Sequence, residues 1–317
     1  MKIENKKIKK TVIILGYQCN NNCQFCLNSN KRNLTNKTTK QIMREMALVK
    51  EGGCTYLELI GGEPTIRPDI VDLIKFAHQL NFKNVVMATN GRLFSYKKFA
   101  EKIIKAGLTD LIFSIHGHNS KLHDSLTRSK GSFRQMMQGI KNVRALGLKR
   151  LGTNTTIVKQ NYRFLKKIGQ LILKLGFRNS EFIFVDPTYG AAHDHFLKFV
   201  PKISKAAPYI HQCLDLGKNK TLHWDIRYVP LCYFTDYLNQ ISELQESITF
   251  HTQHLAPDYI NLDVENSRKK IARIKTKRCN DCLLFDRCEG IWKEYFKYYG
   301  DKELNPVLDK FKLRAHT

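Results

Sequence analysis

Long apolar runs, glycine and proline are all scarce in this sequence of 317 residues. No apolar run approaches the roughly 18 residues that suggest a membrane span, so we expect no transmembrane helix. Glycine (18) and proline (8) are few, and hydrophobic residues make up 42% of the chain. This composition excludes a fibrous or disordered protein. The length allows a sizeable buried core, in one large domain with an appendage or in two domains.

A secretion signal is also missing. The N-terminus is basic (MKIENKKIKK), but the apolar segment TVIILG that follows is too short for a signal peptide and leads directly to cysteines. We therefore expect a cytoplasmic protein. Because a reducing compartment keeps thiols free, the nine cysteines indicate metal or cluster ligation and not a disulfide scaffold.

Acidic residues are few as well: 28 Asp and Glu stand against 53 Lys and Arg, a net charge of +25. Such an excess can favour a polyanionic partner through counterion release. Most basic residues are scattered, and they concentrate only at 2–10 and at 268–278 (RKKIARIKTKR). Ile271 and Ile274 are spaced to share an inward-packing helical face. We therefore expect weak, nonspecific RNA binding, so that a nucleic-acid partner is not favoured.

Short β-branched runs alternate with helical patterns over the first two thirds of the chain. This alternation is typical of βα units around a parallel sheet. Five helices between six strands predict a barrel or an open crescent with its chemistry at the carboxyl ends of the strands. The expected strands are 11–15, 56–60, 84–88, 110–115, 152–158 and 181–185, and the expected helices are 38–50, 70–80, 96–105, 133–146 and 162–175.

The alternation stops near residue 200. The segment TLHWDIRYVPLC (221–232) fits an exposed strand or hairpin arm, and a polar stretch, the basic tract and a cysteine cluster follow it. We therefore expect a barrel domain at 1–200. The remainder, 201–317, is expected to be a small domain that is poor in core and stapled by its cysteines.

The strongest chemical signal is the segment CNNNCQFC, which places Cys19, Cys23 and Cys26 directly after the first expected strand. Iron–sulfur clusters are held by thiolates at such short spacings, whereas tetrahedral zinc needs a fourth ligand nearby. Three thiolates on a four-iron cluster leave one iron open for a substrate or cosubstrate. A zinc loop completed by a distant His or Cys is the alternative.

Polar motifs follow the next three expected strands. Gly61-Gly62-Glu63-Pro64 comes after the second strand, where two glycines let a ligand approach the backbone and a carboxylate can accept hydrogen bonds from an ammonium group. Asn90 follows the third strand and Ser114 lies at the end of the fourth. Both positions can meet a ligand at the barrel rim, although Asn90-Gly91 fits a simple turn equally well.

The CxxxCxxC motif, with Phe25 before its last cysteine and the other motifs in the same order, resembles the signature of radical S-adenosylmethionine (SAM) enzymes over residues 11–190. The resemblance implies a partial (βα)6 TIM-like barrel. It also implies a [4Fe-4S] cluster on the three cysteines, whose open iron binds SAM, and reductive cleavage of SAM to methionine and a 5′-deoxyadenosyl radical. A reducing partner such as flavodoxin or ferredoxin follows from the same resemblance.

The stretch HDSLTRSKGSF (123–133) is similar to a segment of the branch that contains sulfatase-maturating, molybdenum-cofactor and peptide-modifying enzymes. It suggests Arg128 as a contact for the SAM carboxylate, which suits a planar guanidinium. His116 stands where relatives often have Asp. The SAM-binding residues that the resemblance implies are Phe25, Gly61, Gly62, Glu63, Asn90, Ser114 and Arg128.

A second cysteine group lies near the C-terminus. Cys279, Cys282 and Cys288 (CNDCLLFDRC), joined by Cys232, make a credible four-thiolate site. The group resembles the twitch domain, the short relative of the SPASM domain, and so implies an auxiliary [4Fe-4S] cluster. Structural zinc is the alternative, because CxxC pairs also bind zinc. Cys213 is a candidate to replace Cys288 as a ligand.

We therefore expect a radical SAM enzyme that abstracts hydrogen from a peptide or small-metabolite substrate held between the barrel mouth and the auxiliary domain. One alternative is a radical SAM enzyme that modifies RNA. Another is a non-catalytic iron–sulfur or zinc protein that binds nucleic acid. Glu63 and its glycine pair favour an enzyme, because a binding module has no reason to keep a pocket for the SAM amine.

Overall fold

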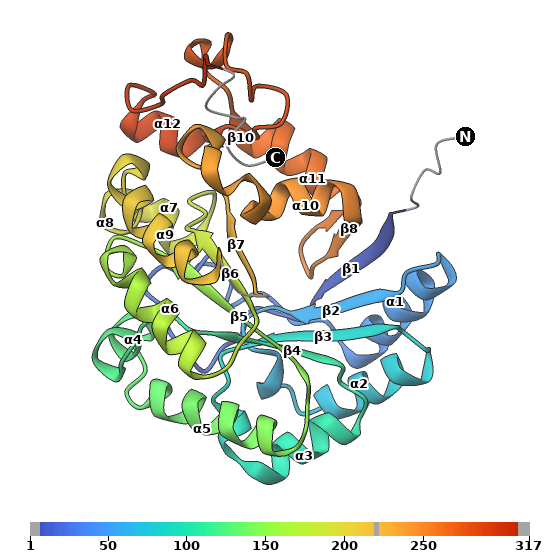
Figure 1. The fold of residues 1–317 in the computed structure, drawn as a ribbon. Coiled ribbons are helices and arrows are strands. Elements are labelled where there is room, and N and C mark those ends of the chain that lie inside the picture. Colours follow the sequence, from blue (N-terminus) through green and yellow to red (C-terminus); the bar gives the residue numbers. More distant parts are fainter. Residues whose placement is uncertain (1–6, 219–221, 310–317) are drawn as a thin grey trace.

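A mainly parallel nine-stranded sheet organises the computed structural model, which describes residues 7–218 and 222–309 (Figure 1). The strands are β1 (Ile8–Ile14), β2 (Tyr56–Ile60), β3 (Asn84–Thr89), β4 (Asp110–Ser114), β5 (Arg150–Ile157), β6 (Asn179–Phe184), β7 (His223–Arg227), β8 (Phe250–Leu255) and β9 (Ile260–Asn261). Their order in space is β7-β6-β5-β4-β3-β2-β1-β8-β9. Only β9 runs antiparallel to its neighbour, and the expected α/β partial barrel is confirmed.

Helices cover the outer face of this curved sheet (Figure 1). The five expected helices are present as α1 (Thr39–Glu51), α2 (Ile70–Gln79), α3 (Lys97–Lys105), α5 (Ser132–Ala145) and α6 (Leu165–Lys174). The sequence did not predict α4 (Ser120–Thr127), α7 (Gly190–Asp194), α8 (Phe196–Phe199), α9 (Ile203–Lys218), α10 (Ser242–Thr249) or α11 (Val264–Ser267). The helix α12 (Lys293–Tyr299) coincides with a run of aromatic residues at helical spacing. No helix in the described part of the chain is long and apolar enough to cross a membrane.

Side chains alternate between the two faces of each strand. In β2, Leu57 and Leu59 are fully buried in the hydrophobic core, whereas Tyr56, Glu58 and Ile60 line a cavity on the inner face. The same alternation along β4, β5 and β6 gives the barrel a polar interior. The sheet therefore encloses a cavity that is lined by charged side chains, which a bound ligand would contact.

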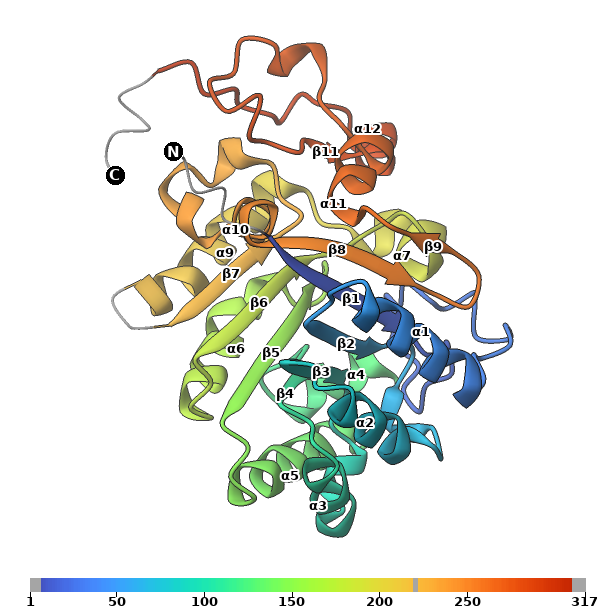
Figure 2. The same ribbon diagram turned by 90° about the vertical axis from the view of Figure 1, so that its right-hand side faces the viewer.

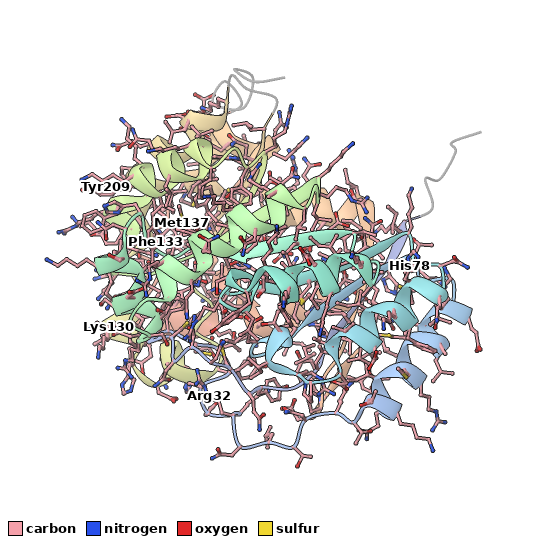
Figure 3. All side chains as sticks on the ribbon, turned by 90° about the horizontal axis from the view of Figure 1, so that it is seen from below. Arg32, His78, Lys130, Phe133, Met137 and Tyr209 are labelled. Carbon is pink, nitrogen blue, oxygen red and sulfur yellow. The ribbon has the colours of Figure 1, made fainter. Side chains whose placement is uncertain are left out.

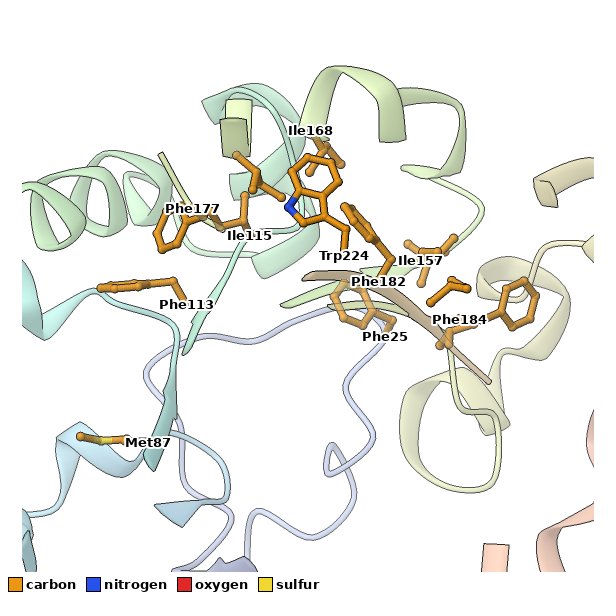
Figure 4. Close-up of a cluster of buried hydrophobic side chains, with 14 of the residues drawn as sticks. Phe25, Met87, Phe113, Ile115, Ile157, Ile168, Phe177, Phe182, Phe184 and Trp224 are labelled. Atoms are coloured by element: carbon orange, nitrogen blue, oxygen red, sulfur yellow. The ribbon is translucent and has the colours of Figure 1, made fainter. Parts of the chain in front are cut away.

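The strand β7 corrects the expectation of an exposed hairpin arm. It pairs in parallel with β6 and extends the sheet, and Trp224 is buried, with its ring 5.6 Å from that of Phe182. Figure 4 shows these two rings next to Ile168 of α6. A strand was among the expectations for this segment, but it is not exposed: His223, Asp225 and Arg227, which gave the segment its exposed appearance, point into the cavity.

The sheet also continues beyond the domain boundary that was expected at residue 200. The strand β8 pairs in parallel with β1 at the other edge, and α10 lies between β7 and β8 (Figure 2). A smaller C-terminal segment follows, with a two-stranded sheet of β10 (Arg273–Ile274) and β11 (Ile291–Trp292). Both views place this segment, drawn in red, beyond α10 and β7.

Candidate functional site

A cavity of about 1040 Å³ occupies the inner face of the barrel. It reaches from the amino ends of the strands, at Lys10 and Arg150, to the carboxyl ends and the loop that carries Cys19, Cys23 and Cys26. The cavity is therefore large enough for a cofactor together with part of a second molecule.

The loop of residues 16–27, called the cysteine loop below, brings its three cysteines to this cavity. Burial raises the pKa of the Cys19 thiol to about 11, and Glu63 and Cys26 act in the same direction. Burial also raises the pKa of Cys23, and again the two other thiols add to the effect. The three thiols thus lie close enough to repel one another as thiolates, an arrangement that a bound cation stabilises.

Phe25 points from the cysteine loop into the barrel core, as Figure 4 shows. It is 6% exposed and meets the ring of His116 edge-on, with the ring centroids 5.0 Å apart. Burial lowers the pKa of His116 to about 3, and the nearby His123 lowers it further. A neutral imidazole therefore lines the cavity at this point.

The two glycines of the second motif pack against the cysteine loop. A Cβ on Gly61 would lie 2.3 Å from the carbonyl oxygen of Gly16, and one on Gly62 would lie 2.1 Å from that of Gln18. The Gly62 N–H donates to the Gly16 oxygen at 2.9 Å. The sequence suggested that these glycines admit a ligand. In the structure they line the cavity, and their missing side chains admit the neighbouring backbone.

The carboxylate of Glu63 is 2% exposed and lines the cavity. Its Oε1 accepts hydrogen bonds from the Thr65 hydroxyl at 2.6 Å and the Thr89 hydroxyl at 2.7 Å, and its Oε2 accepts one from Asn90 N–H at 2.7 Å. Burial raises the pKa of Glu63, and these donors act to lower it. The network fixes the carboxylate in one orientation beside Cys19.

The other expected SAM-binding residues separate into two groups. Asn90 and Ser114 line the cavity, and the Asn90 amide donates to Asn20 of the cysteine loop at 2.6 Å. Arg128 is exposed, ends α4 with φ 48°, and is not among the residues that line the cavity. A contact from Arg128 to a ligand there is therefore not supported. Arg32, which the sequence analysis did not select, lines the cavity near the cysteines.

Two further cavity residues escaped the sequence analysis, Asp186 after β6 and Tyr228 after β7. Thr188 N–H donates to Asp186 Oδ1 at 2.8 Å, and burial raises the pKa of this carboxylate. Tyr228 has a φ of 71°, which is uncommon for a bulky residue. Its N–H donates to Glu243 Oε1 at 2.6 Å. Both residues could have been selected from the sequence because each follows the carboxyl end of a strand.

Ion pairs line the rest of the cavity. Lys10 pairs with Glu58 at 2.8 Å, and Arg227 of β7 pairs with Glu246 of α10 at 2.9 Å. Burial acts to raise the pKa of Glu246, but Arg227 and Arg268 together lower it to about 2. Glu246 therefore ties α10 both to β7 and to Arg268 of the C-terminal segment.

The basic tract at 268–278 differs from the expected helix. Arg268 and Arg273 are 7% and 3% exposed, and Arg268 pairs with Glu289 at 2.8 Å. Ile271 is 67% exposed, whereas Ile274 packs against the core, so the expected inward face shared by the two residues is wrong. A bulged helical turn at 268–272 is followed directly by β10, which moves Ile271 to the surface. In the other basic concentration, residues 2–6 lie outside the described residues.

The C-terminal cysteines gather at a second place. Burial raises the pKa of Cys232 to about 12, and Cys288, Cys282 and Cys279 each act in the same direction. Backbone N–H groups donate to two of these sulfurs: Gly290 to Cys288 and Val307 to Cys282, both at 3.3 Å. The four thiols and these N–H donors therefore gather at one place, between residue 232 and the C-terminal segment.

Cys213 and Cys54 take no part in either group. Cys213 is fully buried in α9 beside Gly169 of α6. Because Cys213 is packed between these two helices, the structure does not support the suggestion that it replaces Cys288 as a ligand. Cys54 is 1% exposed and is the small buried residue that we expected.

Across the described residues, the one group of His, Cys, Asp or Glu side chains with ligand atoms all within 4.8 Å of one another is His251, Asp263 and Glu265. Neither set of cysteines is that compact.

Comparison with protein families matches residues 13–172 to the Radical SAM superfamily. An AdoMet-dependent heme synthase of Methanosarcina barkeri (strain Fusaro / DSM 804) is 31% identical over 175 residues, which are 54% of this chain and 48% of that protein. A probable GTP 3′,8-cyclase of Saccharolobus islandicus (strain M.14.25 / Kamchatka #1) is 29% identical over 176 residues, 55% of this chain and 56% of that protein. The chain spans about half the length of these curated relatives.

Solved structures share the fold over nearly the whole chain. Streptococcus suis SuiB bound to S-adenosylmethionine has a TM-score of 0.67 at 18% identity, covering 92% of this chain and 74% of that one. Native anSMEcpe with bound AdoMet and the Kp18Cys peptide has a TM-score of 0.67 at 14% identity, covering 96% and 94%. At these identities the match establishes the fold.

Proposed function

Because the chain belongs to the radical SAM superfamily, an enzyme family with a [4Fe-4S] cluster and SAM, we propose that Cys19, Cys23 and Cys26 hold that cluster. When bound, the cluster supplies the electron that cleaves SAM to methionine and a 5′-deoxyadenosyl radical. We further propose that this radical takes a hydrogen atom from a peptide or small metabolite in the barrel cavity, which gives 5′-deoxyadenosine and a substrate radical.

The donor set fits an iron–sulfur cluster better than zinc. Thiolates at about 2.3 Å from one zinc ion lie at most about 4.6 Å apart. The three cysteines of the loop are more widely spread than the 4.8 Å that defines a compact group. They also share one cavity, and Cys26 and Cys19 add to the effect of burial in raising the pKa of Cys23, so the space between them suits a multi-iron group.

Glu63 has the features of an ammonium acceptor for the SAM amino group. The carboxylate is buried, fixed by hydroxyl and backbone donors, and faces the cavity beside the cysteine loop. A charge-assisted hydrogen bond in such a place is stronger than one between neutral groups. Arg32 lines the same cavity with no ion pair within the described chain, and we assign the SAM carboxylate to it instead of Arg128.

Asp186 and Tyr228 form the wall that we propose for the substrate. Both lie at carboxyl strand ends on the side nearer the C-terminal segment, where Trp292 meets the Tyr228 ring at 5.0 Å. The strained backbone of Tyr228 fits a functional position, because such strain persists only where the surroundings hold it. A peptide is the favoured substrate, since solved relatives of this fold carry bound peptides.

The C-terminal cysteines are proposed to hold an auxiliary [4Fe-4S] cluster. Cys232, Cys279, Cys282 and Cys288 supply four thiols, as a closed cluster site requires. Hydrogen bonds from backbone N–H groups to the sulfurs of Cys282 and Cys288 stabilise thiolates there. This segment is the second domain that the sequence led us to expect, although it is smaller than 201–317.

The observation that carries the proposal is a fixed, buried carboxylate next to three thiols in one cavity. The test is formation of 5′-deoxyadenosine from SAM by anaerobically reconstituted, dithionite-reduced protein. Changing Cys19, Cys23 and Cys26 together to Ala is expected to abolish the product. Cys54→Ala, a buried thiol outside both groups, is the control and keeps the activity. SAM cleavage at the wild-type rate by the triple variant would overturn the proposal.

A further inference from the structure

An acid-free stretch of sequence covers one side of the barrel. Residues 125–180 contain no Asp or Glu and 13 Lys or Arg. They form the end of α4, then α5, β5 and α6. Twelve of the 13 basic residues are exposed, and Lys159 is half-buried. Charge on this side is therefore positive without interruption along the chain.

One end of this side touches the cysteine loop. Asn22 N–H donates to the carbonyl oxygen of Thr127 at 2.9 Å, and Gln24 N–H donates to that of Leu126 at 2.8 Å. The Gln24 amide also donates to the Ser125 oxygen at 2.8 Å. The turn between α4 and α5 is therefore the outer support of the loop that carries Cys19, Cys23 and Cys26.

Three exposed basic residues stand on this turn and on the first turn of α5: Arg128, Lys130 and Arg134, called the loop-side patch below. None of them forms an ion pair within the described residues. The nearby carboxylate of Asp124 is already bound, because it accepts hydrogen bonds from Gly131 N–H at 2.7 Å and Phe133 N–H at 2.8 Å. Figure 3 shows Lys130 projecting outward from the ribbon.

The loop-side patch faces away from the reaction space, since none of its residues lines the cavity. An RNA substrate must place its reacting base inside the cavity, so contacts on the outer side of the cysteine loop serve it poorly. An electron carrier needs only to approach the cluster from outside. A basic surface beside the loop that holds the cluster is what an acidic carrier requires.

We propose that Arg128, Lys130 and Arg134 form the docking site for an acidic one-electron carrier protein of the flavodoxin or ferredoxin kind. The inference rests on the proposed function, because only reductive cleavage of SAM needs such a partner. The carrier loses one electron for each SAM cleaved. That electron breaks one carbon–sulfur bond of the sulfonium and leaves methionine and the 5′-deoxyadenosyl radical.

The test compares two electron sources on the same reconstituted protein. The variant Lys130→Glu/Arg134→Glu reverses two charges of the loop-side patch. Its matched control, Lys149→Glu/Lys174→Glu, makes the same change in net charge within the acid-free stretch. Lys149 lies beyond the far end of α5 and Lys174 is the last residue of α6, and the 14 residues of α5 span about 21 Å. With reduced flavodoxin, we expect 5′-deoxyadenosine formation to fall about tenfold in the patch variant only.

With dithionite, which needs no docking, both variants should match the unchanged protein. Binding of flavodoxin, measured by fluorescence anisotropy, should weaken in the patch variant and decline with salt in the wild type. This measurement needs no turnover, so it tests docking even where SAM cleavage fails. Lack of dithionite-driven cleavage in every protein would instead contradict the proposed function.

Two results would overturn the docking site. One is equal loss of flavodoxin binding, or no loss, in both variants. The other is tight, sequence-selective tRNA retention at physiological ionic strength that the patch variant loses while flavodoxin binding stays intact. That outcome would show that the acid-free side of the barrel binds RNA and not an electron carrier. Weak tRNA retention that disappears at that salt supports the proposal, because it is the behaviour of a nonspecific polycation.

Discussion

The two cysteine groups differ in what holds them. The cysteine loop follows β1, a strand that pairs with a neighbour on each side, and is clamped by the backbone at Gly61 and Gly62. The C-terminal group spans residues 232–288 and rests on β10 and β11, which are two residues each, and on the seven residues of α12. The first site is therefore built by the sheet, whereas the second depends more on what its own cysteines bind.

Both groups nevertheless stabilise thiolates in the same way. Asn21 N–H donates to the sulfur of Cys19 at 3.3 Å, the same distance as from Gly290 N–H to Cys288. Each set of thiols is also partly buried, which raises the pKa of Cys19 and Cys232. The difference between the sites thus lies in the scaffold and not in the surroundings of the sulfur atoms.

The largest expected effect comes from replacing the cysteines of one site at a time. A variant with Cys19, Cys23 and Cys26 changed to Ala should keep about four irons per chain, in the C-terminal group. A variant with Cys232, Cys279, Cys282 and Cys288 changed to Ala should also keep about four, in the cysteine loop. Iron and zinc analysis of the anaerobic proteins measures both.

The second variant should unfold at a lower temperature, because its C-terminal segment loses the group that staples it. The first should lose SAM cleavage with little loss of stability. Zinc without iron in the first variant would make the C-terminal group a structural metal site.

The same contrast explains how far the sequence could be read. Three cysteines within eight residues, directly after a β-branched run, reveal the first site because all of its ligands are local. The second site needs Cys232 beside Cys279, which lie far apart in the chain, so local spacing could suggest their union but not establish it. The place of β7 inside the sheet was missed because its charged residues face a polar cavity, which a pattern of hydrophobic residues cannot reveal.

Glycine substitutions offer a sharper comparison of the two scaffolds. A Cβ at Gly62 would lie 2.1 Å from the Gln18 oxygen, and a Cβ at Gly290 would lie 2.2 Å from the Ile274 oxygen. Gly62→Ala should therefore displace the cysteine loop and lower SAM cleavage, with the C-terminal irons retained. Gly290→Ala should release the C-terminal irons, because Gly290 N–H is also a donor to Cys288.

Gly53→Ala is the matched control for Gly290→Ala. Gly53 has a φ of 81°, close to the 83° of Gly290, but a Cβ there meets nothing within 4 Å. Gly53→Ala therefore measures the cost of the backbone strain alone, roughly 1 kcal/mol, without the steric clash that a Cβ meets at Gly290. Equal loss of iron from Gly53→Ala and Gly290→Ala would show that close packing does not support the C-terminal site.

A smaller effect is expected where the cysteine loop meets the cofactor. Glu63→Gln keeps the size of the side chain but removes its charge, so SAM binding should weaken by roughly tenfold to a hundredfold. The visible absorbance of the cluster should not change, because no iron ligand is lost. Glu243→Gln, a buried carboxylate against the C-terminal segment, is the control. Loss of cluster absorbance in Glu63→Gln would mean that the carboxylate supports the loop and not SAM.

The smallest effect concerns pH and separates the two regions again. Burial lowers the pKa of His123 in α4 to about 4, while Asp124 opposes the shift. In the unfolded chain this imidazole titrates near 6.5, so the unfolded state binds more protons between those values. The stability from the neutral ring is therefore full above pH 6.5 and is lost as the pH falls toward 4. At pH 5.5 the loss is about 1 kcal/mol.

This loss should appear beside the cysteine loop and not in the C-terminal segment, because residues 262–309 contain no histidine. Hydrogen exchange at pH 7 and pH 5.5, corrected for the intrinsic rates, measures the opening free energy of each region. Amides of α4 and of residues 20–24, which hydrogen-bond to its end, should lose protection on acidification, and those of 280–307 should not. His123→Gln should reduce the difference, since an amide keeps an acceptor for His116 N–H without titrating. The remaining difference should come from His116, whose pKa burial also lowers. Equal acid sensitivity in both regions, or an undiminished difference in His123→Gln, would contradict the role of His123.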